Sequence, residues 1–191
     1  MTNIVKLLKT NISKYRSSWL IVILLFIGFF ISSFYKCNRS FYNNRKANDT
    51  KPVCTMDKYA RYGNTALQVA IPIIMQDKIG IIQSIYVGIS TTILTHGFKH
   101  FYNAIHLEDS IRPNQKKSNM PSGHSSMASC AMTFVCRRYG IKYIVIMLPI
   151  TMITMLCRFE LNCHTISACI AGLIIGVICG YCFSSKKSSQ L

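Results

Sequence analysis

The sequence predicts an all-α integral membrane protein: a six-transmembrane-helix bundle that forms a single domain over residues 1–191. Half of the residues are hydrophobic. They gather in long uncharged runs, close to the about 20 residues that a helix needs to cross a bilayer. Polar segments separate these runs, as expected for loops between membrane helices.

The charge balance restricts the partners. The formal net charge is +16, from 22 Lys and Arg against six Asp and Glu, so we expect acidic partners. Because the apolar runs indicate a membrane, an anionic phosphorylated lipid is favoured and no nucleic acid is expected. The cysteines show no zinc-like spacing with histidine, so we expect no structural metal site. The oligomeric state stays open.

The first transmembrane helix is predicted at residues 18–35, where "WLIVILLFIGFFISSFY" carries no charge. A basic segment precedes it, so a cleaved signal peptide is the alternative. We favour a retained helix, because the apolar run is long for a signal and no A-x-A-like cleavage site follows it. Residues 36–61 are then predicted to be a basic periplasmic loop, with room for an interfacial helix.

Two properties of this loop stay open in the sequence. Its basic residues either rest on anionic head groups or are simply solvated. Cys37 and Cys54 flank polar sequence and either pair in an oxidising compartment or stay free thiols.

Residues 62–183 are predicted to form the helical core, followed by a cytoplasmic tail at 184–191. Its five helices are expected at 64–76, 79–98, 121–135, 143–157 and 165–183, with bends at Pro72 and Pro149. The last helix carries small residues at four-residue steps, at Ala168, Gly172, Gly176 and Gly180. This ridge predicts close packing against another helix.

Six spans put both termini on one side of the membrane. The amino-terminal segment, the 137–142 loop and the tail are all basic, so the positive-inside rule favours cytoplasmic termini. The basic 36–61 loop opposes this orientation, which we keep because the first helix usually dominates. The 97–120 segment and the starts of the helices at 121–135 and 165–183 then reach the periplasmic surface.

This surface gathers residues suited to phosphoryl transfer. Arginine forks and a lysine hold a phosphoryl group, and a helix amino terminus adds backbone N–H donors. One imidazole attacks phosphorus while another protonates the leaving oxygen. The candidate residues are Lys99, Arg112, Ser122, Gly123, His124, Arg158 and His164.

Three strings carry a family resemblance: "RP" at 112–113, "PSGH" at 121–124 and "R-x5-H" at 158–164. They resemble the signature motifs of the type 2 phosphatidic acid phosphatase (PAP2) superfamily. The longer strings "MPSGHSSM" and "TMLCRFELNCHTISA" are most similar to its bacterial lipid A 1-phosphatases. The resemblance implies a bacterial inner-membrane enzyme whose active site faces the periplasm. It also implies removal of a lipid phosphate without a metal or other cofactor.

Carried over by position, His164 is the nucleophile and His124 the general acid. Arg112, Arg158, Ser122 and Gly123 hold the phosphoryl oxygens. The family's lysine position holds Ile105 here, so Lys99 is our candidate, with Lys116 and Lys117 as fallbacks.

A second departure is Ala168, where the family usually has an aspartate that orients the nucleophilic histidine. Glu160, Glu108, Asp109 or a backbone carbonyl is expected to replace it, and the sequence does not choose among them.

We therefore expect a phosphatase acting on the 1-phosphate of lipid A through a phosphohistidine. Removing that phosphate would weaken the attraction of the cell surface for cationic antimicrobial peptides. The alternatives are undecaprenyl diphosphate or phosphatidylglycerophosphate as substrate, a lipid phosphotransferase, and an inactive lipid-binding scaffold, which Ala168 would allow.

Overall fold

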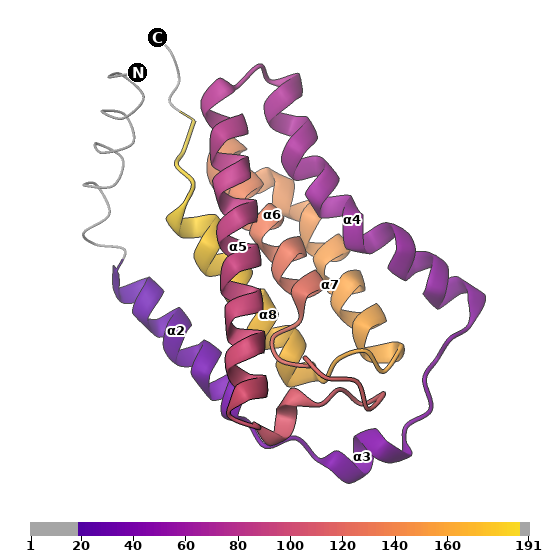
Figure 1. Ribbon diagram of the computed structural model, residues 1–191. Coiled ribbons are helices and arrows are strands. Elements are labelled where there is room, and N and C mark those ends of the chain that lie inside the picture. The colour runs from indigo at the N-terminus through magenta and orange to yellow at the C-terminus, as the bar shows by residue number, and fades with distance from the viewer. Residues whose placement is uncertain (1–18, 188–191) are drawn as a thin grey trace.

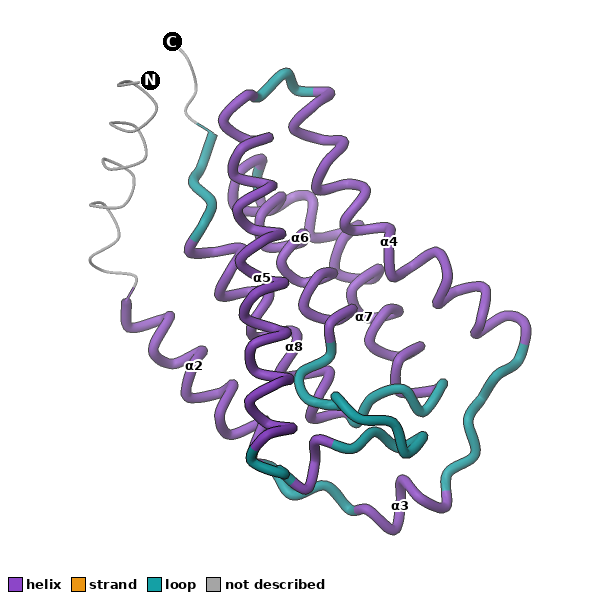
Figure 2. Tube along the Cα trace, in the orientation of Figure 1, coloured by secondary structure: helices purple, strands orange, loops and turns teal. Residues whose placement is uncertain are grey.

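The computed structural model describes residues 19–187, which contain seven α-helices, two short 3-10 helices and no strand (Figures 1 and 2). The predicted all-α class is confirmed for this range. The basic amino-terminal segment and the last tail residues lie outside it. The α-helices are α2 (Trp19–Phe34), α3 (Arg39–Asn44), α4 (Lys51–Ile74), α5 (Lys78–Ala104), α6 (Gly123–Tyr139), α7 (Ile144–Glu160) and α8 (Ile166–Cys182); the 3-10 helices are Glu108–Ser110 and Ile141–Tyr143.

The helices run between two ends of the bundle (Figure 1). At the first, here called the site end, the 105–122 loop and the α7–α8 loop lie beside α3. At the second, the far end, the α4–α5 turn lies near the carboxyl end of α8. Side-chain contacts agree with this arrangement, since Asn119 bonds Thr165 at the site end and Arg138 bonds Asp77 at the far end. The predicted site segments therefore share one end.

α8 packs against α6 through the predicted small-residue ridge. A Cβ atom on Gly176 would overlap the Ser129 hydroxyl and lie 2.7 Å from the backbone nitrogen of Cys130. A Cβ on Gly180 would lie 2.7 Å from Thr133 Cβ. Only glycine allows this backbone separation, so the ridge holds α8 and, with it, the segment that carries His164.

The bundle buries polar side chains and exposes apolar ones. Asn64 of α4 is 1% exposed and donates to the carbonyls of Ala128 and Met147, at 3.1 and 2.9 Å. Apolar residues such as Ile93 and Val145 face outward, at 65% and 75% exposure. Two stretches, α5 and Ile141–Glu160, are long and apolar enough to span a membrane; α2 and α8 are apolar but shorter.

α4 begins at Lys51, not at Asn64, so the predicted 36–61 loop is wrong in its second half. Thr50, which has an extended backbone, precedes the helix, and Pro52 lies in its first turn. Backbone N–H groups in the first turn have no acceptor within the helix, so the proline costs no hydrogen bond there. The charged residues of this segment lie on the helix. Pro72 is inside α4, and the helix continues through it.

The first half of the loop is tied to the site end. Arg39 forms an ion pair with Asp109 at 3.2 Å, and Arg45 forms one with Glu160 at 2.8 Å. These two arginines therefore have protein carboxylates as partners, which neither interpretation of the loop had included. Cys37 is buried, Cys54 is exposed, and both are free thiols.

A buried ion pair closes the far end. Arg138 donates from Nε and Nη2 to the two oxygens of Asp77, at 2.6 and 2.7 Å, and Tyr139 donates to Asp77 at 2.9 Å. Burial raises the pKa of Asp77, but the hydrogen bonds from Arg138, Gly80 and Tyr139 outweigh it and lower the pKa to about 2. Arg138, expected as a surface charge that anchors the topology, is only 6% exposed.

Candidate active site

His164 lies at the site end, just before α8, and is 2% exposed. Its Nδ1 is 2.7 Å from the backbone oxygen of Asn119. A carbonyl oxygen only accepts hydrogen bonds, so Nδ1 carries the proton and Nε2 keeps its lone pair. The carbonyl of Asn119 therefore orients the ring in the role that an aspartate at position 168 would have.

Asn119 is itself held on several sides and is fully buried. Its Nδ2 donates to the Asp109 carbonyl at 2.8 Å and to Thr165 Oγ1 at 3.0 Å. Its Oδ1 accepts from the backbone N–H of Thr165 at 3.1 Å, and its own N–H bonds the Ser110 carbonyl at 2.7 Å. The side chain thus couples the 3-10 turn to the residue that follows the histidine.

Of the acidic candidates for orienting His164, Glu108 is exposed, and the other two are engaged elsewhere. Asp109 pairs with Arg39 and accepts from the backbone N–H of Cys37 at 3.3 Å, and Glu160 pairs with Arg45. Ala168 is fully buried in an apolar cluster that includes Met120. Alanine suits that position, and a carboxylate there would lie among apolar side chains.

The "PSGH" string forms the start of α6. Ser122 is the N-cap: its hydroxyl accepts from the Ser125 N–H at 3.4 Å and from the Ser125 hydroxyl at 2.9 Å. The Ser122 N–H donates to the Ala168 carbonyl at 2.9 Å, which fixes the start of α6 against α8. Gly123 and His124 follow at the first two helical positions and are partly buried.

Lys99 reaches the same helix start from α5. A Cβ built on Gly123 would lie 3.9 Å from Lys99 Nζ, so the ammonium group is close to the first N–H groups of α6. Lys116 and Lys117 are exposed in the loop. Lys99, and not these fallbacks, lies beside the predicted phosphate-binding backbone.

Arg158 lies near the end of α7 and is 7% exposed. Its Nη2 forms a buried ion pair with Asp57 of α4. Its Nε is buried and has no hydrogen-bond partner among residues 19–187. The Arg158 carbonyl accepts from the His164 N–H at 3.2 Å, so the two motif residues are joined through the backbone.

Arg112 is partly buried in the 105–122 loop, where its Nε donates to the Ser118 carbonyl at 3.3 Å. Together with Lys99 and Arg158 it acts electrostatically on the His164 ring. Burial, followed by the charges of Lys99 and Arg112, lowers the pKa of His164 well below its ordinary value, and the bond to Asn119 opposes this only in part. The ring is therefore a neutral base at neutral pH.

The structure brings all seven candidate residues to the site end. His124 follows Gly123 in the first turn of α6, and so lies at the helix start that Lys99 approaches. The remaining histidines, His96, His100 and His106, are exposed.

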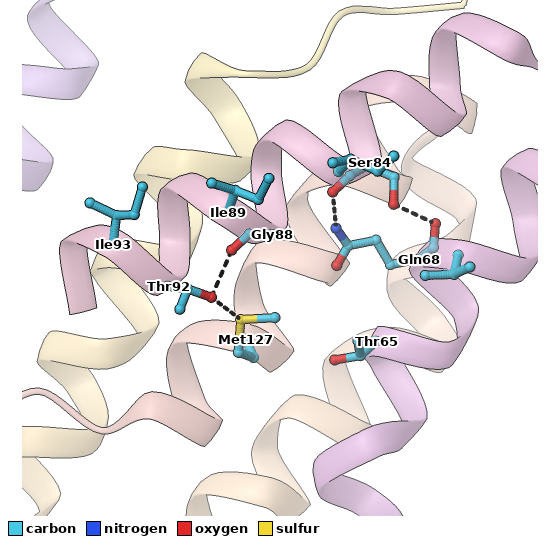
Figure 3. Close-up of a pocket in the computed structure, with 10 residues that line it drawn as sticks. Thr65, Gln68, Ser84, Gly88, Ile89, Thr92, Ile93 and Met127 are labelled. Carbon is cyan, nitrogen blue, oxygen red and sulfur yellow. Dashed lines mark hydrogen bonds between the residues drawn. The ribbon is translucent and has the colours of Figure 1, made fainter. Parts of the chain in front are cut away.

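An apolar groove of about 400 Å³ lies between α4 and α5 (Figure 3). Thr65 of α4 and Met127 of α6 line it, and each lies about one helical turn from a residue near the site: Thr65 follows Arg61, and Met127 follows His124. Gln68 and Ser84 close it by bonding each other's backbone, with Gln68 Nε2 donating to the Ser84 carbonyl at 3.0 Å. The groove therefore begins about one helical turn from Arg61 and His124.

Sequence reasoning missed Asp57 and Arg61, because it placed both in a loop. Their i, i+4 spacing was visible, and ionisable residues inside a membrane bundle usually mark a function. Within residues 19–187 no group of three His, Cys, Asp or Glu side chains could hold a metal ion. The C-x-x-C string from Cys179 to Cys182 lies in α8 as free thiols.

The comparisons with known proteins identify the family of the chain. The family model described as the PAP2 superfamily matches residues 80–188, more than half of the chain. The chain belongs to this superfamily.

Two curated relatives come from the J99 and 26695 strains of Helicobacter pylori, and each is named lipid A 1-phosphatase. The first is 43% identical over 135 residues, 69% of this chain and 71% of the relative. The second is 42% identical over 134 residues, 69% and 70% of the two chains. No solved structure matches the chain.

Proposed function

We propose that this protein is a membrane-embedded lipid phosphatase that removes the 1-phosphate of lipid A. The observation that carries this proposal is the convergence of His124, His164 and three cations at one end of the bundle. The similarity to two lipid A 1-phosphatases supplies the substrate.

The reaction begins with His164. Nε2 attacks phosphorus, the bond from phosphorus to the lipid oxygen breaks, and His124 gives its proton to that oxygen. Lys99, Arg112 and Arg158 with the amino end of α6 stabilise the charge on the phosphoryl oxygens. The products of this step are the dephosphorylated lipid and a phosphohistidine.

Water completes the cycle. His124, now neutral, takes a proton from water as the water oxygen attacks phosphorus, and the bond from phosphorus to Nε2 breaks. Inorganic phosphate leaves, and both rings return to their starting protonation states. The carbonyl of Asn119 keeps Nδ1 protonated throughout.

We infer that the bundle spans the bacterial inner membrane six times, with the site end facing the periplasm. Broad apolar exposure over buried polar side chains supports a lipid environment, since soluble monomers rarely expose large apolar surfaces. The exposed set includes Trp19, Leu20, Leu24, Ile85, Ile89, Ile93, Val145 and Leu156. The α4–α5 groove suits an acyl chain of the substrate.

The inactive-scaffold alternative rested on Ala168, and the carbonyl of Asn119 supplies the acceptor that it lacks. Purified protein incubated with bisphosphorylated lipid A tests the proposal. Mass spectrometry is expected to find loss of the 1-phosphate alone, with no loss for His164→Ala. Release from undecaprenyl diphosphate or phosphatidylglycerophosphate but not from lipid A would reassign the substrate. Phosphate moved onto a second lipid would identify a phosphotransferase, and equal rates for wild type and His164→Ala would favour the scaffold.

A further inference from the structure

One face of α4 points into the bundle, and each of its buried polar residues contacts another helix. Asp57 pairs with Arg158 of α7, Asn64 bonds Thr151 of α7 at 2.8 Å, and Gln68 bonds the Ser84 carbonyl of α5. Arg61 lies between Asp57 and Asn64, at spacings of four and three residues, and therefore belongs to this inward face.

Arg61 differs from its neighbours because its charge has no counter-ion. Its Nε is buried and has no hydrogen-bond partner within residues 19–187, and no carboxylate in that range forms an ion pair with it. Its guanidinium carbon lies 5.1 Å from the ring centroid of the exposed Tyr62. A buried donor without an acceptor is costly, so the unpartnered Nε–H of Arg61 indicates a hydrogen-bond acceptor on a ligand.

The position of Arg61 identifies which part of a lipid it would meet. One turn before it, Asp57 contacts Arg158 in the phosphate site; one turn after it, Thr65 lines the apolar groove (Figure 3). A lipid phosphate bound with its phosphoryl group in the site and an acyl chain in the groove would place its head group beside Arg61.

Arg61 also lies on the side of His124. Thr65, one turn after Arg61, and Met127, one turn after His124, line the same groove, and the charge of Arg61 acts on His124. His124 is the proposed proton donor to the leaving oxygen. The leaving-group side of the scissile bond therefore faces α4.

We propose that Arg61 is a substrate-binding residue that donates hydrogen bonds to head-group oxygens next to the scissile phosphate, and so selects the lipid rather than the phosphoryl group. The ligand class is a neutral oxygen acceptor, a sugar hydroxyl or an acyl carbonyl. This assignment rests on the proposed lipid phosphatase activity.

The test separates the two parts of the substrate. kcat/KM is measured with bisphosphorylated lipid A, and the inhibition constant of orthovanadate reports the phosphoryl site without a leaving group. For Arg61→Gln we expect kcat/KM to fall about 10- to 100-fold, as for loss of a hydrogen bond from a charged donor. The orthovanadate constant is expected to stay at the wild-type value. Lys58→Gln, exposed on the same helix, is the matched control and should change neither quantity.

Two results would overturn the inference. If orthovanadate binding weakens by the same factor as kcat/KM, Arg61 would bind the phosphoryl group together with Lys99, Arg112 and Arg158. If kcat/KM is unchanged, Arg61 would have no role in substrate binding. If the Arg61→Gln variant does not purify as folded protein, the same two quantities are measured for Arg61→Lys. A wild-type protein that releases no phosphate from any lipid would instead refute the proposed function.

Discussion

At the scale of single residues, the orientation of His164 depends on a neutral acceptor. An aspartate would add a negative charge beside the ring, whereas the carbonyl of Asn119 fixes the ring and its tautomer without one. The charges of Lys99, Arg112 and Arg158 act on the same ring, so the proposed nucleophile stays unprotonated.

Replacing Asn119 with leucine tests this orientation. The change removes the side-chain bonds to Thr165 and to the Asp109 carbonyl that hold the backbone oxygen in place. We expect kcat to fall about 10- to 100-fold, with KM little changed, because ring orientation matters in the transition state. Steady-state kinetics on the folded variant give both constants. A rise in KM at constant kcat would mean that Asn119 serves substrate binding instead.

The pH response of His164 follows from its lowered pKa. A lowered pKa means that the folded protein binds this proton only at lower pH, so Nε2 stays unprotonated below the ordinary value of about 6.5. Protonation of the unfolded chain then reduces folding stability as pH falls below about 6.5. Histidine-selective ¹⁵N NMR of the phosphate-free protein should place the titration midpoint of His164 below the ordinary value of about 6.5. An inflection near the ordinary value would contradict the described environment.

The sequence located the motif residues but not their supports. "PSGH" and "R-x5-H" are local strings, and the helix starts they mark follow from capping chemistry. Asn119 acts through its backbone oxygen, which any residue provides, so no sequence pattern identifies it. The pairing of Asp57 with Arg158 joins segments far apart in the chain and needs the packing of α4 on α7.

At the scale of elements, the contact between α6 and α8 sets the distance between the two histidine-bearing segments. At the site end the Ser122 N–H donates to the Ala168 carbonyl, and the glycines continue the contact toward the far end. The repeat of small residues was readable from the sequence because it is periodic. The identity of the helix that packs against these residues could not be predicted, because a periodic pattern shows which face of a helix is packed but not which helix packs against it.

Gly176→Ala should destabilise the bundle. Its Cβ would overlap the Ser129 hydroxyl and the Ser126 carbonyl, and overpacking of this kind costs about 1–3 kcal/mol. Gly88→Ala is the matched control, because nothing lies within 4 Å of a Cβ there. Thermal unfolding in detergent should show a lower Tm for the first variant and no loss for the second. Equal Tm values for the two variants would mean that α6 and α8 are not in this contact.

The amino-terminal half of α4 shows why one helix boundary was missed. Its charged and polar residues lack the apolar run that marked the other spans, so composition favoured a loop. The helix instead follows local signals, Thr50 and Pro52, and the buried charge of Asp57 has its partner on another helix. Weighing those signals above composition would have placed Asp57 and Arg61 on one inward face.

At the scale of the whole molecule, the two ends of the bundle use buried charge differently. At the far end Asp77 and Arg138 neutralise each other, whereas the site end keeps uncompensated cations. We expect the first arrangement to stabilise the fold, and the second suits the proposed binding of a phosphate.

Asp77→Ala should therefore lower stability without touching the site. It leaves Arg138 buried and unpaired, a change that costs about 3–5 kcal/mol. Since the pKa of Asp77 falls from 3.8 to about 2, its contribution is present above about pH 4 and is lost as pH falls toward 2. Chemical unfolding at neutral and acidic pH measures both effects, with the exposed Lys78→Ala as control. A wild-type-like stability at neutral pH would exclude the pair as a stabilising contact.

The proposed orientation predicts that Cys54 is reachable from the periplasm. It is exposed at the start of α4, close to the site end. A membrane-impermeant maleimide applied to cells with a permeabilised outer membrane should label it, and Cys54→Ser should lose that label. Labelling that requires lysis of the inner membrane would place the site end in the cytoplasm.

The most direct measurement is the position of the covalent phosphate during turnover. Protein mixed with substrate and quenched in alkali, which preserves phosphohistidine, is digested and its peptides are sequenced by mass spectrometry. The predicted result is one phosphoryl group on His164 in the wild type and none in His164→Ala. Phosphate on His124, or turnover with no phosphorylated histidine, would contradict the assigned roles of the two rings.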